Sequence, residues 1–418
     1  MPEDARISSI SPRADAAFDR HDVLIVGGGL VGASLAIALE RSGVDAALVE
    51  ATPPGAMPAV FDQRNLSFAE ATVHALTALG VLQKLQAPAG PIREIHVSRA
   101  GDFGRVRLAA SDYGREAFGQ VVVARDFGEA LEARLSELPA LVRHRPARFI
   151  GFDGIEDGWR VVRLANADGE YRVRARLVVG ADGSDSTIRA SLGIEAEVHD
   201  YAQTLFIARL RTARAPDGRA FERLTDNGPT ALLPRGDRHY GLVHGVAAAD
   251  AAAVAALDDA AFLARVQRIF GWRAGRLLGV GPRSQHSARR VVAARVVDTR
   301  AVLVGNAAQS LHPVGAQGFN LGLRDALTLA ECIAGAGDPG APALLEHYTA
   351  RRREDRERTL AFSDGLARIT ANPAALLRPL RSLGLLAIDR DSSLQAMLAG
   401  GAMGYRGDVP ALCRGGAA

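Results

Sequence analysis

The chain has few cysteines and no recognisable metal-binding motif. Its 418 residues include only two cysteines, Cys332 and Cys413, which lie far apart and outside any CxxC or Cys/His ligand spacing. The ten histidines are scattered, and no HExxH motif is present. These absences exclude a disulfide framework, give no indication of a metal site, and favour a reducing compartment.

Lysine and long apolar runs are also scarce. Lys84 is the only lysine among 50 basic residues, and the formal net charge is only +3, so nothing indicates a nucleic-acid partner. No apolar run reaches the roughly 18 residues that a membrane-spanning helix needs. The first twenty residues are polar and predict a disordered lead-in rather than a signal peptide. We therefore expect a cytoplasmic protein that is at most peripheral to a membrane.

Three separate segments show the strand, turn and helix pattern of parallel α/β units. Residues 22–50 form a complete βαβ unit, and the pattern recurs near residues 176–190 and 302–326. Because parallel strands need crossover connections, these segments must assemble into one domain although they are distant in sequence. The sequence therefore predicts an α/β fold built from distant segments.

The intervening segments indicate antiparallel strands and further helices. Residues 92–108 and 200–246 alternate like strands, and Asp168-Gly169 marks a hairpin turn. Residues 66–82 and most of the C-terminal quarter read as helical. We expect the antiparallel strands to form a second domain inserted into the first.

The first α/β segment carries a glycine pattern at its strand-to-helix turn. Gly27, Gly29 and Gly32 satisfy GxGxxG, and Glu50 ends the next strand about 20 residues later. Glycines let the backbone turn tightly and approach a pyrophosphate at the helix N-terminus, while the acid can bond a ribose hydroxyl. The pattern predicts dinucleotide binding with an adenosine ribose that lacks a 2′-phosphate; the alternative is a tight turn without a ligand.

A second match to the same pattern lies near the C-terminus. Gly335, Gly337 and Gly340 also satisfy GxGxxG, but they follow a helix rather than a strand, and Pro339 breaks the segment that follows. We therefore interpret this match as a loop. The chain then has one dinucleotide motif of this kind.

The second α/β segment, LVVGADGSDSTIRASLG, resembles the middle motif of the group A flavoprotein monooxygenases, GADGxxSxxR. In this sequence the motif includes Gly180, Asp182, Gly183, Ser186 and Arg189. The resemblance implies that the aspartate and its loop support both the FAD pyrophosphate and the reduced nicotinamide cofactor, NADH or NADPH. An acidic turn that caps a helix is the alternative, and it would explain the aspartate alone.

The third segment, VLVGNAAQSLHPVGAQGFNLGLRDA, narrows the resemblance. Most of the family has Gly-Asp where this chain has Gly305 and Asn306, and asparagine brings no charge to the flavin's ribityl chain. This variant and its surroundings are similar to the ubiquinone-pathway branch, in particular the 2-polyprenyl-6-methoxyphenol hydroxylases. The resemblance extends from about residue 20 to residue 406.

The resemblance implies a fold and domain boundaries. It implies a Rossmann-like FAD-binding domain of the p-hydroxybenzoate hydroxylase type, with an inserted antiparallel β-sheet substrate domain and C-terminal helices. The expected division is residues 20–195 for FAD binding, with 90–118 contributing strands to the substrate domain, then 196–294 for substrate, 295–345 returning to the FAD-binding domain, and 346–418 as a C-terminal helical region.

The resemblance also implies roles for residues outside the glycine motifs. A flavin-contacting glutamine would be Gln120, with Arg125 close by, and Arg64 would face the pyrophosphate unless it is a solvated loop residue. In the third segment, His312, Pro313 and Gln317 would line the oxygen-reacting side of the flavin, and backbone N–H groups near Gly318, Phe319 and Asn320 would stabilise negative charge on the reduced ring. For His312, a hydrogen bond that anchors the loop is favoured over proton transfer.

These features lead to one preferred function and two alternatives. The resemblance implies an FAD-dependent, NADH- or NADPH-using monooxygenase that hydroxylates a polyprenyl phenol with O₂ through a flavin C4a-hydroperoxide. The same chemistry on a soluble phenolic or secondary metabolite stays open, as does a non-catalytic flavin-binding assembly subunit, because Asn306 replaces the usual acid. The chain lacks the WxWxIP run of flavin halogenases and the GxSxG motif of hydrolases.

A polyprenyl substrate would bring the protein to other quinone-pathway proteins and to the membrane surface. Residues 373–403 mix apolar residues with Arg378, Arg381 and Arg390, as an interfacial helix does. The alternative is a set of helices that pack on the domain and expose their arginines.

Overall fold

The computed structural model describes residues 19–371 and 377–415. Most of the expected disordered lead-in therefore lies outside the described residues, as do residues 373–376 of the C-terminal stretch and the side chain of Arg378. The expectation for the lead-in is wrong at its last two residues, because Asp19 and Arg20 already belong to strand β1. They pair with Val173 and Arg174 of a neighbouring strand.

The first sheet contains the three predicted α/β segments. Its strands lie in the order β18, β19, β11, β1, β2, β8, and β10 and β9 extend it from β11. Their bounds are β1 Asp19–Val26, β2 Ala46–Val49, β8 Val142–His144, β9 Arg148–Glu156, β10 Trp159–Asn166, β11 Gly169–Gly180, β18 Val297–Asp298 and β19 Ala301–Leu303. The central strands β1, β2, β8, β11 and β19 pair in parallel, so the predicted α/β fold is confirmed.

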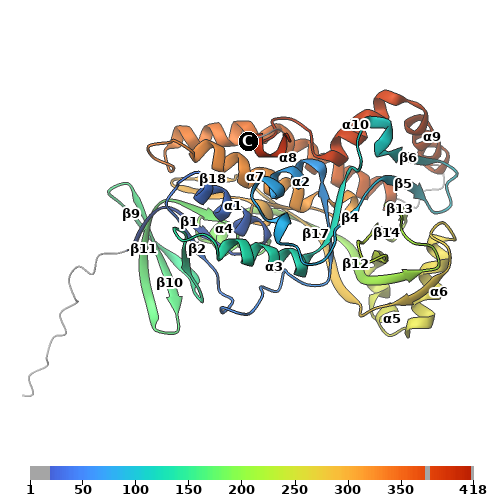
Figure 1. Ribbon diagram of the computed structural model, residues 1–418, viewed down its shortest axis with the longest axis horizontal. Helices are drawn as coiled ribbons and strands as arrows, with labels where there is room; N and C mark the ends of the chain where they lie inside the picture. Colours follow the sequence, from blue (N-terminus) through green and yellow to red (C-terminus); the bar gives the residue numbers. More distant parts are fainter. Residues whose placement is uncertain (1–18, 372–376, 416–418) are drawn as a thin grey trace, which may run out of the picture.

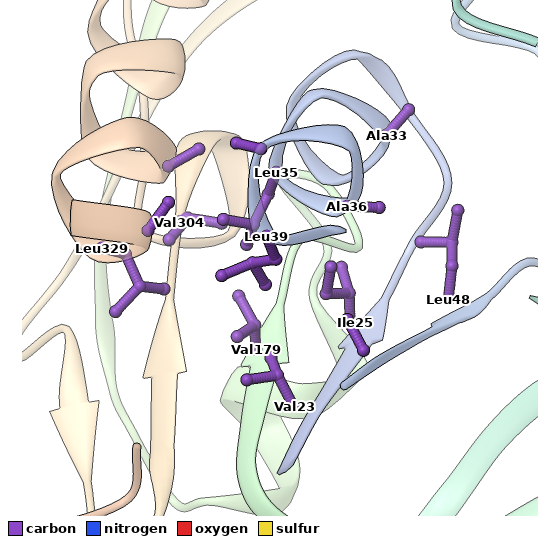
Figure 2. Close-up of a cluster of buried hydrophobic side chains, with 14 of the residues drawn as sticks. Val23, Ile25, Ala33, Leu35, Ala36, Leu39, Leu48, Val179, Val304 and Leu329 are labelled. Atoms are coloured by element: carbon purple, nitrogen blue, oxygen red, sulfur yellow. The ribbon is translucent and has the colours of Figure 1, made fainter. Parts of the chain in front are cut away.

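Apolar strands and two helices form the core at this sheet. The run VLIV (Val23–Val26) in β1 is buried on both faces, as expected for a central parallel strand. Figure 2 shows Val23, Ile25 and Val179 from the sheet packed against Leu35 and Leu39 of α1. Helix α1 (Leu30–Arg41) also contacts α7 (Gly318–Ile333). This contact packs the first α/β segment against the third.

The second sheet is the predicted antiparallel insertion, with nine strands. Its order is β20, β17, β12, β15, β14, β13, β5, β6, and β16 pairs with β12. The bounds are β5 Glu94–Arg99, β6 Arg105–Ala109, β12 Ala196–Thr212, β13 Arg219–Thr225, β14 Gly228–Pro234, β15 Tyr240–Ala247, β16 Leu277–Val280, β17 Ser284–Ala293 and β20 Gln309–Ser310. One pair, β13 with β5, is parallel. Figure 1 shows this sheet at the right of the molecule, with α5 (Ala251–Ala255) and α6 (Asp259–Phe270) beside it.

A small third sheet corrects one prediction. Residues 66–82 are not a single helix: β3 (Asn65–Ala69) precedes α2 (Glu70–Ala78), and a short 3₁₀ turn covers Leu82–Lys84. Strand β7 (Gly119–Val123) pairs with both β3 and β4 (Gly90–Pro91). The partner of β3 is thus about 55 residues away, beyond the reach of local periodicity. Helix α3 (Ala124–Leu135) follows β7.

The C-terminal helices pack on α7 and on the second sheet. Helix α8 (Pro342–Ala371) contacts α7 and strands β13 and β14, while α9 (Leu377–Arg390) lies on β6 and is followed by α10 (Ser392–Met403). Buried ion pairs hold α7 to α8: Arg324 binds Asp355 at 2.7 Å, and Arg352 binds Asp325 at 2.8 Å. Figure 1 shows these helices along the top of the molecule. The GAGDPG match lies between α7 and α8, so its interpretation as a loop is confirmed.

Candidate functional site

The three α/β segments meet where their strands end. Val26 of β1 lies in register with Gly180 of β11, and Gly180 lies in register with Leu303 of β19. The Ala181 N–H donates to the Val26 carbonyl at 2.8 Å, and the Val304 N–H donates to the Gly180 carbonyl at 3.0 Å. The loops that follow the three strands therefore leave from one edge of the sheet, where α/β proteins bind ligands.

The glycines of the first segment have separate reasons to be small. Gly27 has φ +110°, and a Cβ there would lie 2.5 Å from the Ala181 carbonyl oxygen, while a Cβ on Gly32 would lie 1.9 Å from the Gly27 carbonyl oxygen. Gly29 is different, because a Cβ there would meet only Val60 Cγ1, at 3.7 Å. The protein itself requires glycine at 27 and 32, whereas the open approach at Gly29 suits a ligand at the N-terminus of α1.

Glu50 lies beside this turn. Its carboxylate accepts a hydrogen bond from the Gly28 N–H at 2.9 Å and another from the Thr52 N–H at 2.7 Å. These contacts hold the acid at the end of β2, directly next to the glycine loop. Glu50 and the glycine loop, about 20 residues apart in sequence, are thus in direct contact.

Asp182 in the second segment caps a short helix. Its carboxylate accepts hydrogen bonds from the N–H groups of Thr187 at 2.7 Å and Ile188 at 3.1 Å, and from the Ser186 hydroxyl at 2.5 Å. The helix is α4 (Thr187–Ser191). The capping alternative therefore accounts for the contacts that this carboxylate makes within the protein. Gly183 beside it has φ +89° and faces open space.

Arg189 joins the second segment to the third. Its guanidinium donates to the Ala307 carbonyl at 2.9 Å and to the Ser184 carbonyl at 2.8 Å. The arginine of the GADGxxSxxR motif therefore holds two loops together. Sequence reasoning named this residue without a role, because its partner is 118 residues away.

The third segment packs tightly against α1 at its start. Gly305 has φ +59°, and a Cβ there would lie 2.9 Å from Val31 Cγ2. A Cβ on Gly322 of α7 would lie 2.9 Å from the Gly305 Cα. Asn306, between these packed glycines and the loop, is exposed. Its amide is therefore accessible at the point where the first and third segments meet.

His312 is built into the loop as an anchor. Its Nε2 lies 3.0 Å from Gln203 Oε1, its Nδ1 accepts the Val314 N–H at 3.2 Å, and its carbonyl accepts the Ser363 hydroxyl at 3.1 Å. The side chain is buried, and this desolvation lowers its pKa to about 4. A neutral imidazole with both nitrogens engaged positions the loop, which agrees with the anchoring interpretation. Pro313 beside it is exposed.

The N-terminus of α7 presents backbone N–H groups at the end of this loop. No side chain caps the helix, and a Cβ on Gly318 would meet nothing within 4 Å. The first N–H groups of a helix lack intrahelical partners, so those of Gly318, Phe319 and Asn320 can face a ligand. Gln317 turns back and donates from Nε2 to the Gly315 carbonyl at 3.1 Å.

The Asn320 side chain has a structural role that the sequence did not indicate. Its Oδ1 accepts from the Ala69 N–H at 2.9 Å and the Thr72 hydroxyl at 2.7 Å, and its Nδ2 donates to the Ser67 carbonyl at 2.9 Å. The buried amide thus fixes α7 against β3 and α2. The ring of Phe319 packs against Phe68 nearby, with centroids 5.3 Å apart.

The remaining expected site residues lie on or beside the small third sheet and on α3. Arg64 pairs with Asp62 at 2.7 Å, and Arg125 pairs with Glu129 at 3.2 Å on α3. Gln120 lies on β7, in register with Phe68 of β3 and Pro91 of β4. Among the described residues, no hydrogen bond or ion pair that we observe joins these three side chains to the converging loops.

The described residues lack two further kinds of feature. No group of three or more His, Cys, Asp or Glu side chains in the described ranges could hold a metal ion. Within the same ranges, no helix has both the length and the hydropathy to cross a bilayer.

The loops fit a dinucleotide that carries a flavin. Gly29, which the protein itself does not require to be glycine, lies with the uncapped end of α1 and the Glu50 carboxylate at one end of the site. The accessible Asn306 amide and the uncapped end of α7 lie on the third segment. The first group suits a pyrophosphate and adenosine, and the second suits a ribityl chain and a ring that becomes negatively charged.

Comparison with known proteins agrees with this geometry. A family model described as FAD binding domain matches residues 20–363. Ubiquinone hydroxylase UbiL of Rhodospirillum rubrum is 37% identical over 402 residues, covering 95% of this chain and 92% of the relative. The 3-demethoxyubiquinol 3-hydroxylase of Escherichia coli is 28% identical, covering 90% of this chain and 96% of the relative.

Solved structures share the fold. The crystal structure of p-nitrophenol 4-monooxygenase PnpA from Pseudomonas putida DLL-E4 superposes with a TM-score of 0.76, covering 93% of this chain and 99% of that chain, at 17% identity. At this identity the likeness establishes the fold alone. The fold class expected from the resemblance is therefore confirmed.

Proposed function

Because this chain belongs to the FAD binding domain family, we propose that it is the FAD-dependent monooxygenase that hydroxylates a polyprenylated methoxyphenol in ubiquinone biosynthesis. The observation that carries the proposal is the meeting of three distant loops at one sheet edge, in a chain that matches ubiquinone hydroxylases over nearly its whole length. The family and these relatives support an FAD-dependent aromatic hydroxylase.

Each converging loop has a distinct task in this function. When bound, FAD accepts a hydride from NADH or NADPH and supports transfer of one atom of O₂ to an aromatic ring. The N-terminus of α1 holds the pyrophosphate, Glu50 holds the adenosine ribose, and Asn306 holds the ribityl chain. Asp182 and Gly183 complete the pyrophosphate and nicotinamide side of the site. Arg64 faces the pyrophosphate, and Gln120, with Arg125 close by, contacts the flavin.

The third segment prepares the reacting side of the site. His312 fixes the backbone through Val314, so Pro313 and Gln317 are presented in a defined position. The N–H groups at the start of α7 stabilise negative charge at the ring. The protein thus contributes position and electrostatics to the reaction.

The phenol ring binds between the antiparallel sheet and the third segment. Leu224 of β13, Val314 of the loop and Ala367 of α8 form one buried cluster, so this face of the sheet meets the loop. We infer the corresponding domains: residues 20–195 and 295–345 bind FAD, residues 90–118 and 196–294 build the substrate sheet, and residues 346–418 form the helical cover.

We also propose that α9 contacts a membrane from which the polyprenyl substrate enters. Leu380 and Leu383 on α9 are 65% and 57% exposed, and Phe103 is 69% exposed. Phe103 lies beside α9, since its N–H donates to the Ser382 hydroxyl at 3.3 Å. Arg381, which the packed-helix alternative expects to be exposed, is buried against Asp102 at 3.3 Å, whereas Arg390 is exposed.

Vesicle binding tests this contact. Wild-type protein should sediment with anionic lipid vesicles, and replacing both leucines with serine should abolish sedimentation while FAD content stays the same. Equal sedimentation of the two proteins would exclude α9 as the contact. Association with other quinone-pathway proteins stays a prediction.

The flavin and the reductant test the main proposal. Purified protein should be yellow with about one FAD per chain, and it should oxidise NADH or NADPH faster when a prenylated methoxyphenol is present. A matched phenol without the tail distinguishes the polyprenyl substrate from a soluble one. Protein that gains no flavin on reconstitution would refute the proposal.

A further inference from the structure

Glu222 lies on the face of β13 that packs against the loop of the third segment. Phe221 packs with α6 on one face of the strand, 5.5 Å between the rings of Phe221 and Phe270. Leu224 packs on the opposite face with Val314 and Ala367. Because side chains alternate along a strand, Glu222 shares the face of Leu224. The carboxyl group is therefore two residues from the loop contact and on the same side.

The neighbours of Glu222 in the sheet are apolar. It lies in register with Val97 of β5 and Ala231 of β14, and Ala231 lies in register with Val243 of β15. Paired residues project to the same face, so a lone carboxyl group interrupts an apolar row. We observe no hydrogen bond or ion pair to Glu222 in the described part of the chain.

The Glu222 side chain is less fully buried than that of a core residue. Its side chain keeps partial solvent access although protein atoms surround it. This desolvation raises the pKa of the carboxyl group to about 7. An enclosed carboxylate without a partner lowers stability, so a ligand that donates a hydrogen bond would compensate it.

Charged groups on the surrounding elements are engaged elsewhere. Arg99 on β5, in register with Leu224, binds Asp226 and Asp102. On α8, Asp364 accepts the hydroxyl of Tyr201 at 2.8 Å and pairs with Arg368. Past α10, Arg406 stacks on the ring of Phe362. None of these contacts supplies a charge to Glu222.

We propose that Glu222 is the catalytic base that accepts the hydroxyl proton of the phenol. The inference rests on the proposed function and names a residue for it. The phenol O–H bond breaks as the ring reacts, the proton forms an O–H bond with a carboxylate oxygen of Glu222, and the electron pair stays on the phenol oxygen. The added electron density makes the ring a better nucleophile, and such bases contribute about 10²- to 10⁴-fold to rate.

Binding and turnover of Glu222→Gln test the proposal. The probes are 2-methoxy-6-prenylphenol and its O-methyl ether, which lacks the hydroxyl donor, titrated calorimetrically into FAD-loaded protein. The variant should bind the phenol about tenfold more weakly and the ether equally well. Its kcat for hydroxylation should fall about a hundredfold, and a fluorinated phenol that is already ionised at the assay pH should restore most of that loss.

The pH profile and a matched control complete the experiment. Wild-type kcat/KM should fall as the pH drops below about 7, and this limb should vanish in Glu222→Gln. Glu170→Gln, at an exposed position of β11, should behave as wild type. FAD content and circular dichroism establish that both variants fold.

The outcomes separate this inference from the proposed function. If wild type and Glu222→Gln bind phenol and ether alike and share one pH profile, Glu222 is not the base, and the proposed function stands. Another outcome is that wild type binds the phenol more tightly than the ether, with this difference lost in Glu222→Gln, and yet hydroxylates no phenol. In that case the proposed function fails and Glu222 is a binding residue only.

Discussion

A methyl group on Gly27 would lie 2.5 Å from the carbonyl oxygen of Ala181, a separation that real Cβ atoms do not show. This contact joins the first α/β segment to the second across more than 150 residues of sequence. It places the loop after β1 directly against the loop after β11. The close approach is possible only with glycine at position 27, whose φ of +110° also favours glycine.

Gly29→Ala separates ligand contact from folding. The added methyl group meets only Val60 Cγ1 at 3.7 Å, so the protein without FAD should keep its stability. FAD binding should weaken at least tenfold, because the methyl group occupies the approach of the pyrophosphate. Gly337→Ala, in the second GxGxxG match, faces open space and should bind FAD normally. Fluorescence titration of FAD into apoprotein measures both, and unchanged affinity of Gly29→Ala would place the pyrophosphate elsewhere.

His312 should make stability depend on acidity. Its pKa is about 4 in the folded protein, below the ordinary value of 6.5, so the unfolded chain binds more protons between these values. The free energy of unfolding should therefore fall as the pH decreases from 6.5 to 4, with His312 contributing up to about 3 kcal/mol. Urea unfolding of His312→Gln should show a flatter dependence. The control is His347→Gln, at an exposed position. The same dependence of the unfolding free energy on pH in all three proteins would contradict the anchoring role.

Glu222 should have the opposite dependence. Its folded pKa of about 7 lies above the ordinary value of 4.5, so the folded state binds more protons between these values and loses stability as the pH rises. Glu222→Gln removes this loss and should raise the free energy of unfolding at pH 8 by up to about 3 kcal/mol. The difference should disappear at pH 4. A variant that is less stable than wild type at pH 8 would show that the carboxylate has a favourable partner.

Asp355 should be essential for joining α8 to the cofactor loop region. It is fully buried and accepts hydrogen bonds from Arg324 and Arg352, which hold its pKa below the usual range. Asp355→Asn leaves two buried guanidinium groups short of a counter-charge and should cost about 3 to 5 kcal/mol of unfolding free energy. Glu354→Gln, exposed on the same helix, should change it by less than about 1 kcal/mol. Similar losses in both variants would show that the buried network is not a stabilising contact.

Local chemistry in the sequence was sufficient to predict much of the fold. The apolar strands, the glycine turn at Gly27 and the Asp168-Gly169 hairpin each depend on neighbouring residues, and each was found where expected. Residues 66–69 were mispredicted as helix because their strand character comes from pairing with β7. Pairing between strands so far apart in sequence does not show in the local periodicity of apolar residues.

The candidate site was predictable only in part for the same reason. Asp182 could be interpreted as a cofactor residue or a helix cap from sequence, and its cap contacts exist without any ligand. The roles of Arg189 and the Asn320 side chain depend on partners 118 and 251 residues away. Glu222 was missed because an acid in an alternating strand reads as solvent-facing, and only the packing of Leu224 on Val314 shows which face it occupies.

Oxygen transfer tests the central claim most directly. Purified protein loaded with FAD is supplied with NADH or NADPH, ¹⁸O₂ and 2-methoxy-6-prenylphenol. The phenol is then extracted and analysed by mass spectrometry. We expect one ¹⁸O atom in the new ring hydroxyl of each product molecule, and less product from Gly29→Ala at FAD concentrations that saturate only the wild type. Reductant consumption that yields only peroxide and leaves the phenol unlabelled, for this phenol and for longer-tailed ones, would contradict it.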